Sequence, residues 1–292
     1  MCDVIYKVFL NLFKCWASIS PSRKHRPHAG VAIVTVVVMA DVSKTHPRRE
    51  SLELRERLVG GFSDGIVAPQ GLIAHGRGEM FYYLLGERTV KEARVAARAA
   101  AATLVKATRP VISVNGNVAA LCPRAVVELS KAVPARIEIG LFHRSDERLS
   151  AIQGALEREG ASQVLGFLPD GKIPGLEGAR GLCARDGIFS ADVVLVALED
   201  GDRAEALTRM GKKVIAVDLN PLSRTARSAT VTVVDEVTKA LPLIAGCVEE
   251  LKDDTAEVER ALERYDRDEN LSAVMRVMAS NLGLLGQEPD AK

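Results

Sequence analysis

A short glycine-rich segment of this 292-residue sequence combines residue types that bind anions. GLIAHGRGE spans residues 71–79 and places Arg77 between Gly76 and Gly78, with His75 close by as a further donor. A planar guanidinium suits phosphate or carboxylate, and glycine lets a backbone approach a ligand closely. We interpret the segment as an anion-binding loop, although a turn with an exposed arginine explains the residues equally well.

A second polar segment, VDLNPLSRTAR at residues 217–227, directly follows the apolar run KVIAV. Ligands of open α/β sheets bind where strands end, and a helix start there favours an anion. Its polar side chains are Asp218, Asn220, Ser223, Arg224 and Thr225. We expect contacts with a ribose, a base edge or a phosphate. A turn capped by Asp218 or Asn220 remains the alternative.

A third segment, VNGNVAAL at residues 114–121, also follows an apolar run. Asn115, Gly116 and Asn117 form a turn signal whose two amides could hold a carbonyl or hydroxyl group. A plain turn explains the same residues equally well.

Carboxylates gather in a fourth segment, LEDGDRAEAL at residues 198–207. Glu199, Asp200 and Asp202 lie between an apolar run and a helical pattern. Such a cluster can hold magnesium on phosphates, but a carboxylate at a helix start also serves as an N-cap and then needs no ligand.

Alternating strand and helix signals must position these four segments. The predicted strands are PVISV (110–114), ARIEIGLF (135–142), ADVVLVAL (191–198), KVIAV (213–217) and TVTVV (230–234). The predicted helices between or before them cover 89–107 with a Thr89–Glu92 capping box, 123–132 from Pro123, 145–160 from Ser145, and 202–210 closed by Gly211. Apolar strands alternating with helices predict an α/β fold, a Rossmann-like, mostly parallel sheet with helices on both faces.

Helical segments flank this core at both ends. RRESLELRERLVGGF (48–62) predicts a helix that stops at Gly60–Gly61, followed by a loop rich in glycine and proline through residue 79. The charged tail from Val248 to Leu285 is strongly helical. Its apolar stripe is Leu251, Val258, Leu262 and Tyr265. We expect the stripe to pack on its own domain, with a partner surface as the alternative.

Residues 1–38 differ in character from the rest. They hold the basic cluster SRKHRPH and then the apolar run GVAIVTVVV, which is too short to span a membrane. We expect translation to begin at Met39, or residues 1–38 to be a poorly ordered extension. In both cases residues 39–292 form the α/β domain with its helical tail.

Bulk properties exclude several classes of protein. A net charge of +1, from 39 basic and 38 acidic residues, gives no support to a nucleic-acid or membrane partner. The 5 cysteines are scattered and the 5 histidines lack metal-binding spacing, so we expect reduced thiols and no protein-ligated structural metal.

Three motif matches fail on their context. GFLPDGK (166–172) resembles a Walker A loop but lacks the following Ser or Thr, and Pro174 blocks the required helix. GFSDG (61–65) matches a nucleophile elbow but follows a helix instead of a strand. GRGEMF (76–81) fails as a dinucleotide fingerprint at its last position, which counts against a nicotinamide oxidoreductase.

Six blocks of the sequence resemble the archaeal phosphopantothenate synthetases (4-phosphopantoate–β-alanine ligases). The blocks are HPRRESLELRERLV, GLIAHGRGE, PVISVNGNVAAL, IPGLE, ADVVLVALEDGDRAEAL and GKKVIAVDLNPLSRTA, in that order from about Lys44 to Leu282. The resemblance implies a cytoplasmic homodimer in coenzyme A biosynthesis. It would convert ATP, with Mg²⁺, 4-phosphopantoate and β-alanine to 4′-phosphopantothenate, AMP and diphosphate through an acyl adenylate.

The resemblance also implies roles for individual residues. Nucleotide contacts are expected from Arg55, Arg77, Asp218, Leu219, Asn220, Arg224, Thr225, Asp235 and Glu236. We further predict catalytic roles for Arg77, His75 and Arg224, since fixed cations stabilise charge on an α-phosphate. Asn115, Gly116 and Asn117 are the candidates for the side that binds the acyl acceptor.

Two departures from the family pattern concern single amides. Glu236 stands where the family pattern has asparagine, and Gly140 stands where INLFYR would place another. Neither change removes a cation. The rival hypothesis from another class is a nucleotide-binding regulatory protein without catalysis, which would release no AMP in response to β-alanine.

Overall fold

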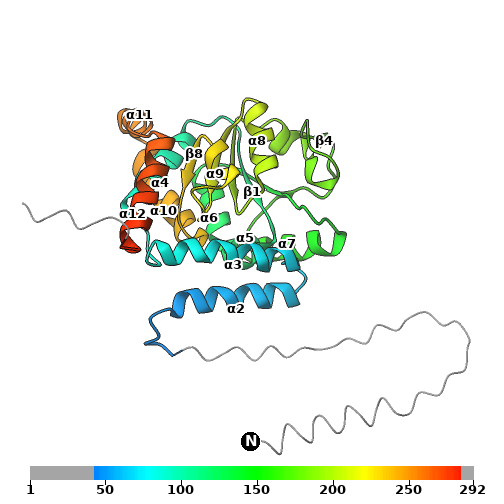
Figure 1. Cartoon of the computed structure of the whole chain (residues 1–292). Helices are drawn as coiled ribbons and strands as arrows, with labels where there is room; N and C mark the ends of the chain where they lie inside the picture. Colours follow the sequence, from blue (N-terminus) through cyan, green and yellow to red (C-terminus); the bar gives the residue numbers. More distant parts are fainter. Residues whose placement is uncertain (1–42, 284–292) are drawn as a thin grey trace, which may run out of the picture. The chain divides into compact units, whose positions relative to one another are not determined.

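A six-stranded parallel sheet forms the centre of the computed structural model, which describes residues 43–283 (Figure 1). The strands, in the order in which they lie side by side, are β3 (Val164–Leu165), β2 (Arg136–Ile139), β1 (Pro110–Val114), β6 (Val193–Ala197), β7 (Lys213–Val217) and β8 (Val231–Val233). The chain first builds outward from β1 and then, starting at β6, builds outward on the other side. The strand order therefore reverses between β1 and β6, which defines a switch point.

Alternate side chains of each strand enter two separate cores. In β6, Val193, Leu195 and Ala197 join the larger core, whereas Val194 and Val196 join the smaller one. The larger core lies under α4 (Lys91–Val105), α6 (Pro123–Ala132), α7 (Asp146–Arg158) and α10 (Val237–Leu251), and the smaller one under α8 (Gly201–Arg209). Both faces of the sheet are covered, which confirms the predicted α/β fold.

Shorter elements complete the region around the strands. They are α5 (Gly116–Leu121), α9 (Arg224–Ser228), the antiparallel pair β4 (Gly171–Lys172) and β5 (Leu182–Cys183), and the turns η1 (Ala179–Gly181) and η2 (Arg185–Phe189). The predicted strands and the Pro123, Ser145 and Gly211 helix boundaries are confirmed.

The largest correction concerns the segment before β1. Gly60 and Gly61 do not end the first helix, because α2 runs from Arg49 to Ser63. The predicted loop is a second helix, α3 (Pro69–Leu84), which contains the whole GLIAHGRGE segment. Pro69 stands in its first turn, where proline costs no hydrogen bond. Arg77 is therefore presented on a helix, and Gly76 and Gly78 are helical residues.

The predicted capping box at Thr89 is also wrong. Val90 is the N-cap of α4, and Thr89 Oγ1 instead donates a hydrogen bond to Asp235 Oδ2 at 2.6 Å. This contact joins the start of α4 to the segment after β8. Thr89, whose spacing from Glu92 predicts a local helix cap, instead connects two segments that are far apart in the sequence.

The charged tail packs on its own domain, as expected. α11 (Thr255–Glu263) and α12 (Arg267–Asn281) follow α10, and Leu251 and Val258 are buried in the larger core. Tyr265 Oη accepts a hydrogen bond from Thr232 N at 3.0 Å, which ties the tail to β8.

The rejected motifs have ordinary structural roles. Gly61 to Gly65 ends α2, and Gly166 to Lys172 connects β3 to β4 without a following helix. Within residues 43–283, no helix is long and apolar enough to cross a membrane. The predictions for Met39 and residues 1–38 lie outside the described residues.

Candidate active site

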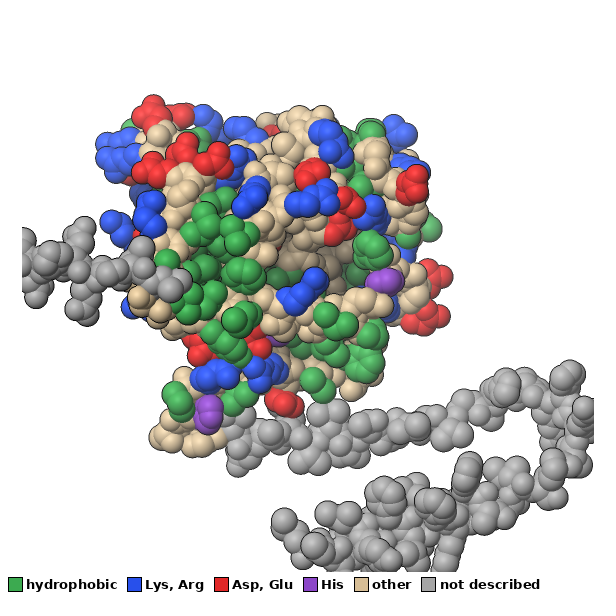
Figure 2. Space-filling view, in the orientation of Figure 1, with side chains coloured by type: hydrophobic (Ala, Val, Ile, Leu, Met, Phe, Trp, Pro, Cys, Tyr) green, Lys and Arg blue, Asp and Glu red, His purple; other side chains and the backbone are tan. Residues whose placement is uncertain are grey.

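Two adjoining cavities open at the carboxyl ends of the strands, one on each side of the switch point. The cavity beside β1 and β2 has a volume of about 370 Å³. The cavity beside β6 and β7 has a volume of about 590 Å³. They share one wall, formed by Ala74, Arg77, Leu198 and Glu199. Figure 2 shows a hollow above α3 with basic, acidic and hydrophobic side chains around its rim.

Asn115 joins the two central strands at the floor of the smaller cavity. Its Oδ1 accepts a hydrogen bond from Val118 N at 3.1 Å, so it caps α5. Its Nδ2 donates to the carbonyls of Ala197 at 2.8 Å and Leu198 at 3.2 Å. The amide is thus fully engaged within the protein and fixes the ends of β1 and β6 relative to each other.

Asn117 fixes helix α3 against this floor. Its Nδ2 donates to the carbonyl of Gly71 at 2.8 Å, and its Oδ1 occupies the space that a Cβ at residue 71 would need. A glycine is therefore required at position 71 for this close approach. Asn115, Gly116 and Asn117 all line the smaller cavity, together with two residues that the sequence did not single out, His143 and Arg148.

Asp218 organises the larger cavity at the end of β7. Its Oδ1 accepts from Asn220 N at 2.9 Å, and its Oδ2 accepts from Ser223 Oγ at 2.5 Å. Burial raises the pKa of Asp218, although these two hydrogen bonds oppose the shift. Thr225 is buried and donates to the carbonyl of Glu199 at 2.9 Å. The segment after β7 thus forms a cavity wall whose polar side chains are held in place by hydrogen bonds within the protein.

Two predicted cations behave differently at this wall. Arg224 forms ion pairs with Asp202 at 2.7 Å and with Glu205 at 2.9 Å. These pairs are exposed to solvent, and each contributes little to stability. The side chain of Arg77 is exposed, and among residues 43–283 it forms no ion pair or hydrogen bond. Arg77 is therefore the cation that the shared wall offers to a ligand.

Arg55 and His75 lie away from both cavities. His75 and Glu79 are buried on another face of α3, and Arg55 of α2 pairs with Glu79 at 2.9 Å. Burial lowers the pKa of His75, while the neighbouring Glu79 opposes the shift and Arg55 supports it. The structure does not bring these two predicted residues together with Arg77.

Asp235 and Glu236 are buried after β8 and line neither cavity. Asp235 accepts the hydrogen bond from Thr89, and Glu236 caps α10 by accepting from Thr238 N at 2.6 Å. Burial raises the pKa of both carboxyls. Leu219 is buried beside α3, against Gly78.

A buried arginine beneath the site was missed by sequence reasoning. Arg203 of α8 is 2% exposed, and its Nη1 donates to the carbonyl of Arg180 at 2.9 Å. Its Nη2 has no hydrogen-bond partner, and it lies 2.7 Å from the position of a Cβ on Gly140. Gly140, the departure from the family pattern, thus leaves room for this guanidinium.

The carboxylates of the segment at residues 198–207 have different roles. Asp200 caps α8 by accepting from Arg203 N at 2.9 Å, and Asp202 pairs with Arg180 at 2.9 Å in addition to Arg224. Within the described part of the chain, no group of three or more metal-ligating side chains is gathered. The N-cap interpretation of Asp200 is confirmed.

The strand order and the paired cavities define a Rossmann-like α/β protein with cavities at the carboxyl ends of its strands, which is where ligands of such sheets bind. The model of the phosphopantothenate/pantothenate synthetase family matches residues 92–281. The chain belongs to this family, and it is an enzyme.

Similar archaeal proteins carry one name. A 4-phosphopantoate–β-alanine ligase of Thermococcus kodakarensis is 48% identical over 252 residues, which cover 86% of this chain and 97% of the relative. The ligase of Methanosarcina mazei is 48% identical over 251 residues, covering 86% and 99%. That of Methanospirillum hungatei is 55% identical over 213 residues, covering 73% and 87%. The resemblance inferred from the six sequence blocks is thereby confirmed.

Proposed function

We propose that this protein uses ATP to condense 4-phosphopantoate with β-alanine, forming 4′-phosphopantothenate, AMP and diphosphate in coenzyme A biosynthesis. The observation that carries the proposal is 48% identity along 97% of a relative with the name 4-phosphopantoate–β-alanine ligase. The paired cavities support it, because the reaction must hold a nucleotide and two acids side by side.

The nucleotide occupies the larger cavity in this proposal. Asp218 and Asn220 stand at the end of β7, where an acidic residue commonly binds ribose hydroxyls in such sheets. Arg224 must exchange its exposed carboxylate partners for phosphate oxygens, which costs little because the pairs are solvated. The acids occupy the smaller cavity, where Arg148 and His143 can face an anion.

The first chemical step takes place at the shared wall. A carboxylate oxygen of 4-phosphopantoate attacks the α-phosphorus of ATP, and diphosphate leaves. Arg77 carries no competing partner within residues 43–283, so its guanidinium can stabilise the charge that develops on the α-phosphate. The second step is attack of the β-alanine amine on the acyl adenylate. Alignment of the substrates supplies much of the acceleration, and no protein nucleophile is needed.

Magnesium fits this site as a companion of the nucleotide. The described residues gather no cluster of three metal ligands, but Mg²⁺ binds well through phosphate oxygens with one or two carboxylates. Phosphate oxygens of the nucleotide in the larger cavity would supply most of its ligands. Bound there, the ion would neutralise charge on the β- and γ-phosphates.

We also infer that the protein acts as a homodimer in the cytoplasm. Large apolar side chains are exposed on adjacent helices, with Ile73 of α3 at 64% and Phe62 of α2 at 45%. A second copy is the partner that covers them, and Ile73→Asp is expected to shift the species measured by light scattering from dimer to monomer. A monomeric wild type would contradict this inference. The three cysteines in residues 43–283 are free thiols, which suits a reducing compartment.

The decisive experiment incubates the full-length protein with ATP, Mg²⁺, 4-phosphopantoate and β-alanine and follows AMP and amide product together. We expect equal amounts of AMP and 4′-phosphopantothenate, formed only when both acids are present. Release of ADP in place of AMP would replace the adenylate with an acyl phosphate. A folded protein that binds ATP without any turnover would contradict the proposal.

A further inference from the structure

Glu199 is the carboxylate that faces both cavities. Among residues 43–283, Arg77 and Glu199 are the ionisable residues that line the smaller and the larger cavity alike. A cation and a carboxylate therefore border the passage through which the two bound substrates must meet. The proposed adenylation assigns a role to Arg77 but none to Glu199.

An unusual backbone conformation turns Glu199 toward this passage. Leu198, the residue before it, has a φ of +54°, in the left-handed region that non-glycine residues rarely adopt. Leu198 N donates to the carbonyl of Val217 at 3.1 Å, so the turn is fixed to β7. Strained residues of this kind persist where the surrounding structure holds them, and they cluster at functional sites.

The protein holds the carboxylate of Glu199 in place but leaves part of its hydrogen-bond acceptor capacity unused. Its Oε1 accepts a hydrogen bond from Asp200 N at 3.0 Å. Its Oε2 lies 3.4 Å from Arg203 Nε, and 14% of the side chain is exposed. Of the other carboxylates that line the cavities, Asp218 is assigned to the nucleotide and Asp200 caps α8. Glu199 thus retains accepting capacity toward a ligand.

The charged groups around Glu199 tune its basicity in opposite directions. Burial raises the pKa of Glu199, and the guanidinium of Arg203 opposes this shift while Asp200 adds to it. Arg77 faces the same passage from α3. A carboxylate with a raised pKa is a stronger base, and Arg203 keeps it charged and oriented.

We propose that Glu199 is the general base of the second step, accepting a proton from the ammonium group of β-alanine. The inference rests on the proposed function and adds to it a residue that touches the nucleophile. Arg203 is the positioning residue, because it acts on the substrate only through Glu199.

The ammonium transfers one proton to the Glu199 carboxylate and becomes a neutral amine. The nitrogen lone pair forms the amide bond at the acyl carbon, while the bond from that carbon to the phosphate oxygen breaks and its electron pair leaves with AMP. The second nitrogen proton passes to water, and Glu199 then returns its own proton to water.

Measuring the two half-reactions separately in Glu199→Gln tests this role. Glutamine keeps the size and a hydrogen-bond acceptor but cannot take the proton. Diphosphate–ATP exchange dependent on 4-phosphopantoate should remain within about threefold of wild type. Amide formation with β-alanine in a single turnover should fall about 10²- to 10⁴-fold, the usual contribution of a general base. Its residual rate should rise steadily with pH as free amine accumulates, whereas the wild-type rate levels off above the pKa of Glu199.

Hydroxylamine and Asp200→Asn provide matched controls. Hydroxylamine is uncharged at neutral pH and needs no base, so it should trap the adenylate at similar rates in wild type and Glu199→Gln. Asp200→Asn makes the same charge change one residue further on and retains an N-cap. Its amide-forming rate should fall far less than that of Glu199→Gln.

Other outcomes would overturn the inference. Equal loss of both half-reactions in Glu199→Gln would mean that the residue only supports the structure around Arg203. Full amide formation by Glu199→Gln, or a larger defect in Asp200→Asn, would assign the base elsewhere. Absence of exchange in the wild type would instead contradict the proposed function, so the two failures are distinguishable.

Discussion

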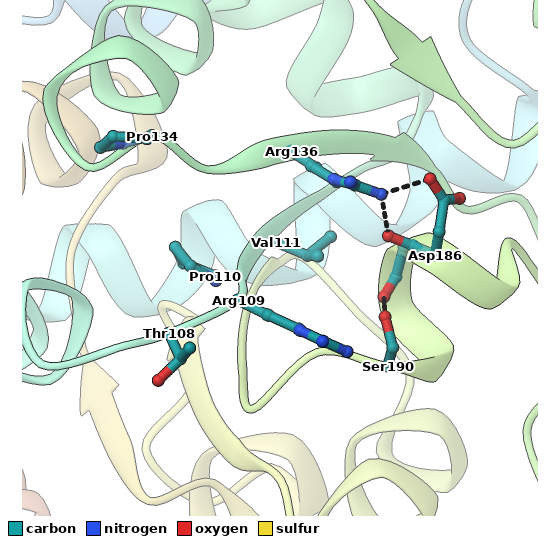
Figure 3. Close-up of a pocket in the computed structure, with 9 residues that line it drawn as sticks. Thr108, Arg109, Pro110, Val111, Pro134, Arg136, Asp186 and Ser190 are labelled. Carbon is teal, nitrogen blue, oxygen red and sulfur yellow. Dashed lines mark hydrogen bonds and ion pairs between the residues drawn. The ribbon is translucent and has the colours of Figure 1, made fainter.

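Cavities lie at both ends of the parallel strands. We call the side on which the strands begin the amino edge of the sheet and the side on which they finish the carboxyl edge. The polar groups that line the cavities at these two edges differ in whether they have hydrogen-bond partners. The amino edge has a cavity of about 340 Å³ beside the starts of β1 and β2, close in volume to the smaller cavity at the carboxyl edge (Figure 3). There Arg136 donates to both the carboxylate and the backbone carbonyl of Asp186. Thr108 N and Arg109 N donate to Asp192 at 2.6 and 2.8 Å.

At the carboxyl edge, by contrast, polar groups are left available. Within residues 43–283, Arg203 Nη2 is buried without a partner, and Leu198 is held in a strained conformation. Buried groups without partners cost free energy, and use by a ligand or a reaction is one reason for a folded protein to retain them. Cavity volume does not separate the two edges, and neither does an exposed arginine without an ion pair in the described part of the chain, since Arg77 lines one edge and Arg109 the other. The buried, unpartnered Arg203 Nη2 and the strained Leu198 are the features that distinguish the carboxyl edge.

Removing one arginine from each edge gives the largest expected contrast. Arg77→Ala should lower kcat/KM for AMP release about 10²- to 10³-fold, because it removes a donor to the charge that develops on the α-phosphate. Arg136→Ala should change kcat/KM by less than about threefold, since the pair of Arg136 with Asp186 is exposed. The measurement is steady-state AMP release by both variants, with equal melting temperatures as the control. A comparable loss in Arg136→Ala would erase the distinction between the edges.

The second contrast separates stability from activity. Glu138 of β2 is fully buried and accepts hydrogen bonds from Ala184 N at 2.8 Å and Ile188 N at 2.6 Å. These bonds fix the segment that forms one wall of the amino-edge cavity. Glu138→Ala should lower the free energy of unfolding by about 2–4 kcal/mol, because two buried donors lose their acceptors. Urea unfolding measures the loss, and kcat of the folded fraction at low temperature should be preserved. A variant of unchanged stability would show that these bonds contribute nothing net.

The smallest contrast lies between two faces of one helix. Arg77 faces the cavities, whereas His75 is buried on another face of α3, where burial lowers its pKa below 6.5. The unfolded chain therefore binds this proton more tightly, and stability is lost as pH falls from 6.5 toward the folded pKa. The slope from one group is at most about 1.4 kcal/mol per pH unit.

Unfolding in urea at pH 7.5 and at pH 5 checks this linkage. His75→Gln has no such proton to bind, so it should lose less stability than wild type over this interval. An identical loss in both proteins would place the acid sensitivity elsewhere.

The sequence predicted the alternating part of the fold because each strand there is a continuous apolar run. Runs such as KVIAV and ADVVLVAL can be buried on both faces, and glycine and proline mark their ends. The prediction failed for α3, since Gly71, Gly76 and Gly78 favour a loop on intrinsic propensity. Packing against Asn117 and the α2 helix overrides that preference.

The prediction of site residues likewise succeeded where a local pattern was sufficient and failed where tertiary packing decided. The segments after β1, β6 and β7 were identified because parallel strands bring their carboxyl ends together. Arg203 could not be identified, since a charged residue in a helix is normally exposed and its burial depends on Gly140, far away in sequence. The separation of His75 from Arg77 likewise follows only once both are placed on a helix, where residues two positions apart face different sides.

The three glycines of α3 have a further consequence for hydrogen exchange. Each weakens a helix interior by about 1 kcal/mol relative to alanine, whereas α4 contains an uninterrupted run of four alanines from Ala99 to Ala102. We therefore expect the helix that carries Arg77 to open locally at a lower free energy than α4. We expect its amide hydrogens to exchange faster than those of α4, and a nucleotide bound as proposed between Arg77 and the segment after β7 to slow that exchange. Local opening of the helix that forms one wall of the proposed site would thus be coupled to binding of the nucleotide.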